Sequence, residues 1–184
     1  MTIKNITAIL VCGGLLGLGG CVSVTAVEAK DTPIAASPYG LPHYKRVNLL
    51  VADLERSLTI YRDILGFSPG NISDSALGSF SYPVFNIPKE ARMRYTYLGE
   101  PGENRVFGLT EVRHVDLPKP ADRPHMSASV IGVTGLEAKI DKIEALGLKT
   151  SPSKIAGGSE FRFMEQSFVD YDGHLIVLYE ILGD

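Results

Sequence analysis

Residues 47–66 read VNLLVADLERSLTIYRDILG, and this stretch decides the fold. Apolar residues occupy every second position over 47–51, which is the period of a half-buried strand. Asp53 is a suitable N-cap residue, and the apolar residues over 54–65 recur at spacings of four, three and four, which places them on one helix face. Gly66 then supplies a left-handed helix stop. The stretch therefore predicts a strand, a capped entry into a helix, and a defined helix end.

The same unit recurs 82 positions later in the chain. Internal similarity at a fixed offset indicates a duplicated structural unit, although two unrelated strand–helix units remain the alternative. In the second copy a strand over 131–133 leads through Gly135 into a helix over 136–146, which ends at Gly147. The matching pairs are Pro42-His43 with Pro124-His125, Val51 with Val133, Leu54-Glu55 with Leu136-Glu137 and, after a one-residue slip, Leu65-Gly66 with Leu146-Gly147.

Shorter strand-like segments follow each helix. They lie at about 79–86, 93–98 and 105–112 in the first copy, and at about 161–169 and 174–182 in the second, with an edge piece near 149–152. Asp172-Gly173 marks a hairpin turn between the last two, and the proline-rich residues 117–124 link the copies. We therefore predict an α+β fold of two βαβββ modules, at about 41–116 and 123–184, that form a cup-shaped, curved mixed β-sheet with the helices outside. The interior of such a cup is where a ligand would bind.

A short apolar segment precedes this domain. Residues 6–18 are apolar after a weakly positive start, which is the pattern of a cleaved secretory signal and is too short to span a membrane. Residues 18–21, Leu-Gly-Gly-Cys, resemble a bacterial lipobox, in which Cys21 becomes the lipid-bearing first residue. An ordinary cleaved signal or a buried strand is the alternative. We predict a signal peptide over 1–20 and a flexible, lipid-anchored tether over 21–40.

These features predict an exported protein held in the cell envelope by a lipid anchor and facing the periplasm. Val22 stands in place of the Asp associated with inner-membrane retention, which favours the outer membrane where the source cell has two membranes. Cys12 leaves with the signal and Cys21 carries lipid, so the mature fold is expected to have neither a disulfide nor a catalytic thiolate. The formal net charge of −3 and the lack of any basic run argue against a nucleic-acid partner.

Several phrases of the domain resemble the vicinal oxygen chelate superfamily, which includes glyoxalase I, extradiol dioxygenases and bleomycin-resistance proteins. The first phrase reads VADLERSL over 51–58 and continues as YRDILGF over 61–67. In the second half Leu146-Gly147 is followed by DYDGHLI over 170–176. The resemblance covers about 41–182 and implies the paired βαβββ fold. It implies little about chemistry, because this fold hosts many activities.

The enzymes of that superfamily usually hold one divalent metal through His, Gln or Glu on cup-facing strands. The resemblance places the corresponding positions at Arg46, Gly108, Ala128 and Val177, of which Gly108 is the hardest to align. None of these side chains can coordinate a divalent cation, and the guanidinium of Arg46 would repel one. We therefore predict no cofactor.

Four other residues are candidate substitute metal ligands. His43, Glu111, His125 and Glu180 each lie three positions from one of the lost ligand sites. An odd displacement turns a strand residue to the other face of its sheet, so we expect these side chains to point toward the helices or the cup rim unless a bulge intervenes. A divalent metal site built from them is the alternative to a metal-free cup.

The same alternation predicts a cup lined mainly by small and apolar side chains. The first strand would contribute Arg46 and Asn48, and the last strand Val177 and Tyr179. The donor fork of Arg46 matches a carboxylate, so the lining suits an organic molecule with an apolar body and an anionic or carbonyl oxygen. Alternatively, Arg46 pairs with one of the glutamates named above and only supports the sheet.

Three further residues are candidates for the site. Tyr95 and Tyr97 share one face of their strand and would stack on a ligand, although an aromatic row at strand spacing is also the pattern of a core. Glu165 is the candidate general base, because a carboxylate buried within an apolar strand becomes a better proton acceptor. A solvated edge residue is the alternative for Glu165. The sequence supports no Ser-His-Asp or Cys-His set.

The leading hypothesis is an envelope protein that binds a small organic molecule in a metal-free cup. It would sequester that molecule or turn it over by acid–base chemistry, and as an enzyme it would be a glyoxalase-like lyase or isomerase or a dioxygenase relative. A metal-dependent lyase or dioxygenase with relocated ligands is one alternative, and a non-catalytic envelope protein that docks a partner chain is another. A homodimer is also open, because in this superfamily modules pair within one chain or across two.

Overall fold

The structure, a computed structural model, describes residues 44–119, 123–158 and 161–183. The predicted signal peptide, lipidated Cys21, tether and His43 lie outside these described residues. None of the helices in the described ranges is long and apolar enough to cross a membrane.

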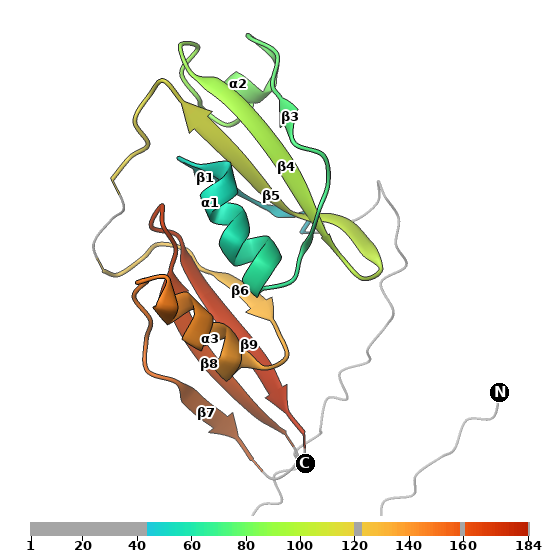
Figure 1. Cartoon of the computed structure of the whole chain (residues 1–184), viewed down its shortest axis with the longest axis vertical. Helices are drawn as coiled ribbons and strands as arrows, with labels where there is room; N and C mark the ends of the chain where they lie inside the picture. The colour runs from blue at the N-terminus through green and yellow to red at the C-terminus, as the bar shows by residue number, and fades with distance from the viewer. Residues whose placement is uncertain (1–43, 120–122, 159–160, 184) are drawn as a thin grey trace, which may run out of the picture. The chain divides into compact units, whose positions relative to one another are not determined.

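The first module contains one long helical segment and a five-stranded mixed sheet (Figure 1). Its strands pair in the order β1-β5-β4-β2, with β3 also on β4, and β1 runs parallel to β5. The elements are β1 (Val47–Val51), α1 (Leu54–Leu58), its π-helical continuation η1 (Thr59–Ile64), β2 (Ser68–Pro69), β3 (Ser73–Asp74), α2 (Ser81–Val84), β4 (Arg92–Glu100) and β5 (Glu103–Arg113).

The second module repeats this plan with a four-stranded mixed sheet. Its strands pair in the order β6-β9-β8-β7, and β6 runs parallel to β9 as β1 does to β5. The elements are β6 (Ser129–Gly132), α3 (Leu136–Ala145), β7 (Lys154–Gly157), β8 (Arg162–Val169) and β9 (Leu175–Leu182). The predicted α+β fold of two strand–helix–strand modules is thereby confirmed.

Strand registers show that the two modules are equivalent residue by residue. Asn48 pairs with Gly108 in β1 and β5, and Val130 pairs with Val177 in β6 and β9. Asn48 and Val130 differ by the offset of 82 seen in the sequence. Gly108 and Val177 therefore occupy the same place in their modules, as the sequence alignment predicted.

The predicted helix boundaries are also confirmed. The Asp53 side chain accepts a hydrogen bond from the backbone N–H of Arg56 (3.0 Å), which satisfies one free donor of the first turn. Gly66 and Gly147 end the two helices at φ +92° and +78°, a conformation that favours glycine.

One predicted strand was wrong, and a second is confirmed only as a single bridge. The segment predicted over 79–86 holds helix α2, because Pro83 lacks the N–H that a ladder needs but is tolerated in the first turn of a helix. The edge piece predicted near 149–152 makes only one bridge, Thr150 with Phe168, and the edge strand is β7 farther on. Within the edge piece, the backbone N–H of Ser167 donates to the Ser151 hydroxyl (3.0 Å) and not to a backbone carbonyl.

One apolar core spans both modules and lies on the helix side of the sheets. Tyr61 is fully buried within it, and its ring lies 4.8 Å from that of Phe107. A smaller core beneath α2 is built around Tyr82 and Met93. The main core comprises Leu49, Val51, Leu54, Leu58, Ile60, Tyr61, Leu98, Phe107, Leu109, Leu136, Ile140, Ile143, Met164, Phe168, Ile176 and Leu178.

Candidate functional site

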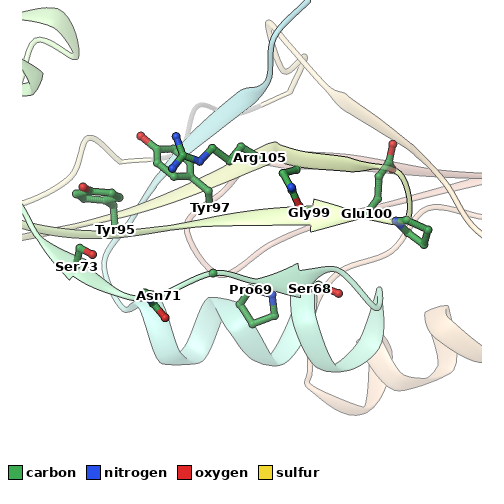
Figure 2. A pocket seen from close by; sticks show the side chains of 12 residues that line it. Ser68, Pro69, Asn71, Ser73, Tyr95, Tyr97, Gly99, Glu100 and Arg105 are labelled. Carbon is green, nitrogen blue, oxygen red and sulfur yellow. The ribbon is translucent and has the colours of Figure 1, made fainter.

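The first sheet turns two different faces to its surroundings. Leu49, Leu98 and Leu109 face the core, so the alternate residues along β1, β4 and β5 face the other way. Figure 2 shows Tyr95 and Tyr97 standing on this second face, away from the helix. Their rings lie 5.4 Å apart.

Two arginines lie against the ring of Tyr97. The guanidinium carbon of Arg46 is 4.4 Å from the ring centroid and that of Arg105 is 5.3 Å from it, distances typical of cation–π contacts. Within the described ranges neither arginine forms an ion pair. The Tyr97 ring therefore lies beside two cations that form no ion pair with any carboxylate in the described part of the chain.

Arg105 reaches this face because the strand is irregular. The pairing of β4 with β5 shifts between Leu98 and Glu100, and Arg105 has φ +64°. A bulge re-aims the side chains that follow it. Strict alternation from Gly108 would place Arg105 on the helix side, so sequence reasoning missed it. The only signal available was its position just after Gly102 in a hairpin.

The neighbouring polar group is Asn48 on β1. Its side-chain amide donates to the Thr110 hydroxyl oxygen (3.2 Å) on the neighbouring strand β5. Gly108 is the register partner of Asn48 on that strand, and any Cβ at Gly108 would collide with the Asn48 amide. The glycine therefore makes room for the amide that borders the site.

A cavity of about 800 Å³ opens beside the tyrosines, between β4 and the β2–β3 segment (Figure 2). This volume lies within the usual range for small-molecule sites. Glu100 at the hairpin turn is the one carboxylate among its described lining residues. The polar and aromatic groups that line the cavity include Asn71, Ser73, Tyr95, Tyr97, Asn104 and Arg105.

The residues at the family's metal-ligand positions do not fit a divalent cation. Arg46 is cationic, and Gly108, Ala128 and Val177 carry no donor atom. Among the residues that the structure describes, no group of three or more His, Cys, Asp or Glu side chains could hold a metal ion. His125 is partly buried in the loop before β6.

Glu111 is a helix-capping residue and not a partner of Arg46. Its Oε2 accepts from the backbone N–H of Leu54 (2.9 Å) and from Nη2 of Arg94 (2.7 Å), and its side chain is 4% exposed. Arg113 contacts the other carboxylate oxygen (3.1 Å). The anion thus satisfies the first turn of α1.

Glu180 has the same role in the second module. It accepts from the backbone N–H groups of Gly135 (2.6 Å) and Leu136 (2.8 Å) at the start of α3. The expectation that Glu111 and Glu180 point toward the helices is confirmed, and the alternative pairing of Arg46 with either glutamate is wrong.

The predicted residues of the second module lie apart from the arginines. Tyr179 stacks on Phe163 (5.1 Å), and Glu165 pairs with Tyr179 in the β8–β9 register. Neither Val177 nor Tyr179 lines the cavity beside Arg105. The structure therefore brings Arg46, Asn48, Tyr95 and Tyr97 together and leaves Val177, Tyr179 and Glu165 on the other sheet.

Polar contacts hold the two modules together. The buried Tyr61 hydroxyl donates to Asp170 Oδ2 (2.8 Å), and the backbone N–H of Ala52 donates to Asp172 Oδ1 (3.0 Å). A ring nitrogen of His174 contacts the Leu50 carbonyl oxygen (2.9 Å). Burial, followed by the nearby Asp170 charge, raises the pKa of Tyr61 well above its usual value.

Two modules of this topology, with helices on one side of curved mixed sheets, define the glyoxalase-like fold. Residues 40–178 match the Glyoxalase/Bleomycin resistance protein/Dioxygenase superfamily, and the chain belongs to this family. No curated protein sequence matches the chain significantly.

Solved structures agree with this assignment at the level of the fold. A glyoxalase family protein from Bacillus cereus superposes with a TM-score of 0.63 at 13% identity, covering 81% of this chain and 100% of that one. A glyoxylase/bleomycin resistance protein/dioxygenase domain from Frankia sp. EAN1pec gives a TM-score of 0.53 at 17% identity, covering 78% and 94%. At these identities the likeness shows a shared fold alone.

Proposed function

We propose that this chain binds a small organic anion on the Tyr97 face of its first module. The observation that carries the proposal is the pair of guanidinium groups, Arg46 and Arg105, beside one aromatic ring without an ion-pair partner among the described residues. Arginine donors match a carboxylate in geometry and charge. The adjoining cavity of about 800 Å³ has room for the rest of such a molecule.

Electrostatics support an anion more than a neutral ligand. Two cations close to one ring repel each other, and an anion bound beside them would relieve that repulsion while accepting hydrogen bonds from arginine. Glu100 borders the cavity at the hairpin turn, so the positive end of the site is the one beside Arg46 and Arg105.

The test is a thermal-shift and titration screen of the full-length chain against aromatic acids and oxo-acids. A specific ligand stabilises the protein by about 2.7 kcal/mol at a hundredfold excess over its Kd. Arg46→Ala and Arg105→Ala should each lose most of the shift. Arg46→Lys should recover only part of it, because lysine lacks the donor fork.

Arg62→Ala is the matched control, because Arg62 is exposed on the helix and pairs with Asp63 beside it. An equal loss of the shift in this control, or an unchanged shift in both site variants, would remove the two arginines from the binding site.

We propose further that binding requires no divalent metal. The support is the chemistry of Arg46, Gly108, Ala128 and Val177 at the family's ligand positions. Ligand affinity should be the same after chelation and after dialysis against Zn²⁺, Mn²⁺, Ni²⁺ or Fe²⁺. Stoichiometric metal by elemental analysis, with binding lost on chelation, would favour a metal-dependent lyase or dioxygenase.

The cellular location is proposed from the sequence of the N-terminal segment. Cys21→Ser should move the protein from the membrane fraction to the soluble fraction, because it removes the site of the lipid anchor. Retention of Cys21→Ser in the membrane fraction would contradict a lipid anchor at this residue.

A further inference from the structure

A second, smaller cavity lies on the same face of β4 as the anion site. It has a volume of about 180 Å³, and Tyr95 and Tyr97 line it as they line the larger one. Its apolar walls include Met93 from β4 and the rings of Phe80 and Phe85 from the α2 segment. Its polar lining residues are Asp74, Ser75, Ser79, Ser81 and Thr110. A ligand lying on the two tyrosine rings can therefore extend from the larger cavity to the rings of Phe80 and Phe85.

The α2 segment is held in place over the sheet. The Tyr82 hydroxyl donates to the Ala91 carbonyl oxygen (3.1 Å). The backbone N–H of Ser75 donates to the Met93 carbonyl oxygen (2.8 Å). Tyr82 itself is 4% exposed in the smaller core. These bonds anchor the backbone of the α2 segment beside β4, which lowers the cost of ordering that segment on binding.

The two phenylalanines of this segment are not core residues. Phe80 is 79% exposed and Phe85 is 37% exposed. Aromatic rings left in water beside a cavity lose apolar hydration when a ligand covers them, which favours an apolar ligand group. An engineered apolar cavity of about 150 Å³ holds benzene, so the small cavity suits a group of about one aromatic ring.

We infer that the ligand is an amphipathic carboxylate, with its anionic end at Arg46 and Arg105 and an apolar group of about one ring against Phe80 and Phe85. This inference rests on the proposed anion site and adds its ligand class. The Tyr95 and Tyr97 rings lie 5.4 Å apart. A ring bonded directly to its carboxylate is shorter than this separation, so we expect a spacer of roughly two methylene groups.

The experiment is an NMR titration of the full-length chain with propanoate, benzoate and 3-phenylpropanoate. Burial of a phenyl group should make 3-phenylpropanoate bind about tenfold or more tightly than propanoate, with benzoate between them. Phe80→Ala and Phe85→Ala should each lose much of this gain while propanoate binding stays the same.

Leu77→Ala is the matched control, because Leu77 is an exposed apolar residue of the same segment (61%) outside the cavity lining. It should keep the full gain.

The outcomes separate the two proposals. If no carboxylate binds, the anion site itself is wrong. If propanoate and 3-phenylpropanoate bind equally, or the gain survives in both phenylalanine variants, the anion site stands and the amphipathic ligand class is wrong. If Leu77→Ala loses the same gain in affinity for 3-phenylpropanoate, the amphipathic ligand class is also wrong, because any change in this segment would then weaken binding.

Discussion

The two modules share one scaffold but present different surfaces. In both, a glutamate from the strand beside the first strand caps the helix: Glu111 for α1 and Glu180 for α3. On the opposite face the modules differ, because the first carries Arg46 against Tyr97 and the second carries Tyr179 against Phe163. The comparison teaches that the helix side of the sheets is shared by the two modules, while the proposed ligand site lies on the other side of the first module alone.

The largest expected effect sharpens the first half of this comparison. Glu111→Ala should lower the free energy of unfolding by about 3 kcal/mol, because it leaves Arg94 and the first turn of α1 without a buried anion. Glu180→Ala should cost about 1 kcal/mol, the usual value for a lost helix cap, since Glu180 is more exposed and has only backbone partners. Chemical denaturation of both variants measures the difference. Equal losses of unfolding free energy in the two variants would contradict the distinction between Glu111, which also forms an ion pair, and Glu180, which only caps its helix.

A second prediction concerns the contact between the modules. Tyr61→Phe should cost about 1–3 kcal/mol, because Asp170 Oδ2 then loses its donor in a buried setting. The raised pKa of Tyr61 adds a pH dependence with a definite sign. The neutral hydroxyl stabilises the fold below the ordinary tyrosine pKa of about 10, and this stability is lost as the pH rises above it.

The alkaline dependence should therefore be weaker in Tyr61→Phe than in the wild type. Denaturation curves at pH 7 and above provide the measurement, and parallel losses of stability in the two proteins would show that another group is responsible.

The third prediction compares Gly108 of the first module with Val177 at the equivalent position of the second module. Gly108→Ala should cost about 1–3 kcal/mol, because the new methyl group meets the Asn48 amide. In the double variant with Asn48→Ala the cost should fall below the sum of the single costs. Val177→Ala at the equivalent position of the second module should cost less than about 1 kcal/mol, since it only shortens a half-buried side chain. Simple additivity of Gly108→Ala with Asn48→Ala would contradict the proposed collision.

The sequence predicts those features of the fold and the site that follow regular strand and helix periods. Regular periods account for the registers of Gly108 and Val177, for the helix cap at Asp53, and for the orientation of Glu111 toward the helix. Arg105 depends on a bulge and a positive φ, which reverse the alternation and leave little trace in the residue pattern.

The segment around α2 was missed for a similar reason. Its alternating residues over 79–86 have strand spacing, and only Pro83 argues against a ladder. Phe80 and Phe85 line the small cavity because that segment packs beside Met93 of β4. Such a tertiary arrangement is not determined by local spacing.

The smallest expected effect lies at the β8–β9 turn. Burial, more than any neighbouring charge, raises the pKa of Asp172, whose Oδ2 has no hydrogen-bond partner among the described residues. The folded protein therefore holds this proton more tightly than the unfolded chain, whose Asp pKa is about 3.9. Its contribution is favourable below that value and is lost as the pH rises through the folded pKa.

Relative to Asp172→Asn, the wild type should thus lose a small amount of stability between about pH 4 and neutrality. Denaturant midpoints at several pH values test this, and a difference that is constant with pH would mean that Asp172 titrates alike in both states.

The most direct test of the central claim is the location of a bound carboxylate on the two modules. Crystals of the chain soaked with 3-(4-bromophenyl)propanoate would place the bromine by its anomalous signal. We expect the carboxylate beside Arg46 and Arg105 over the Tyr97 ring, with the bromine near Phe80 and Phe85. Density for the ligand on Val177 and Tyr179 of the second module, with the Tyr97 face empty, would contradict the account.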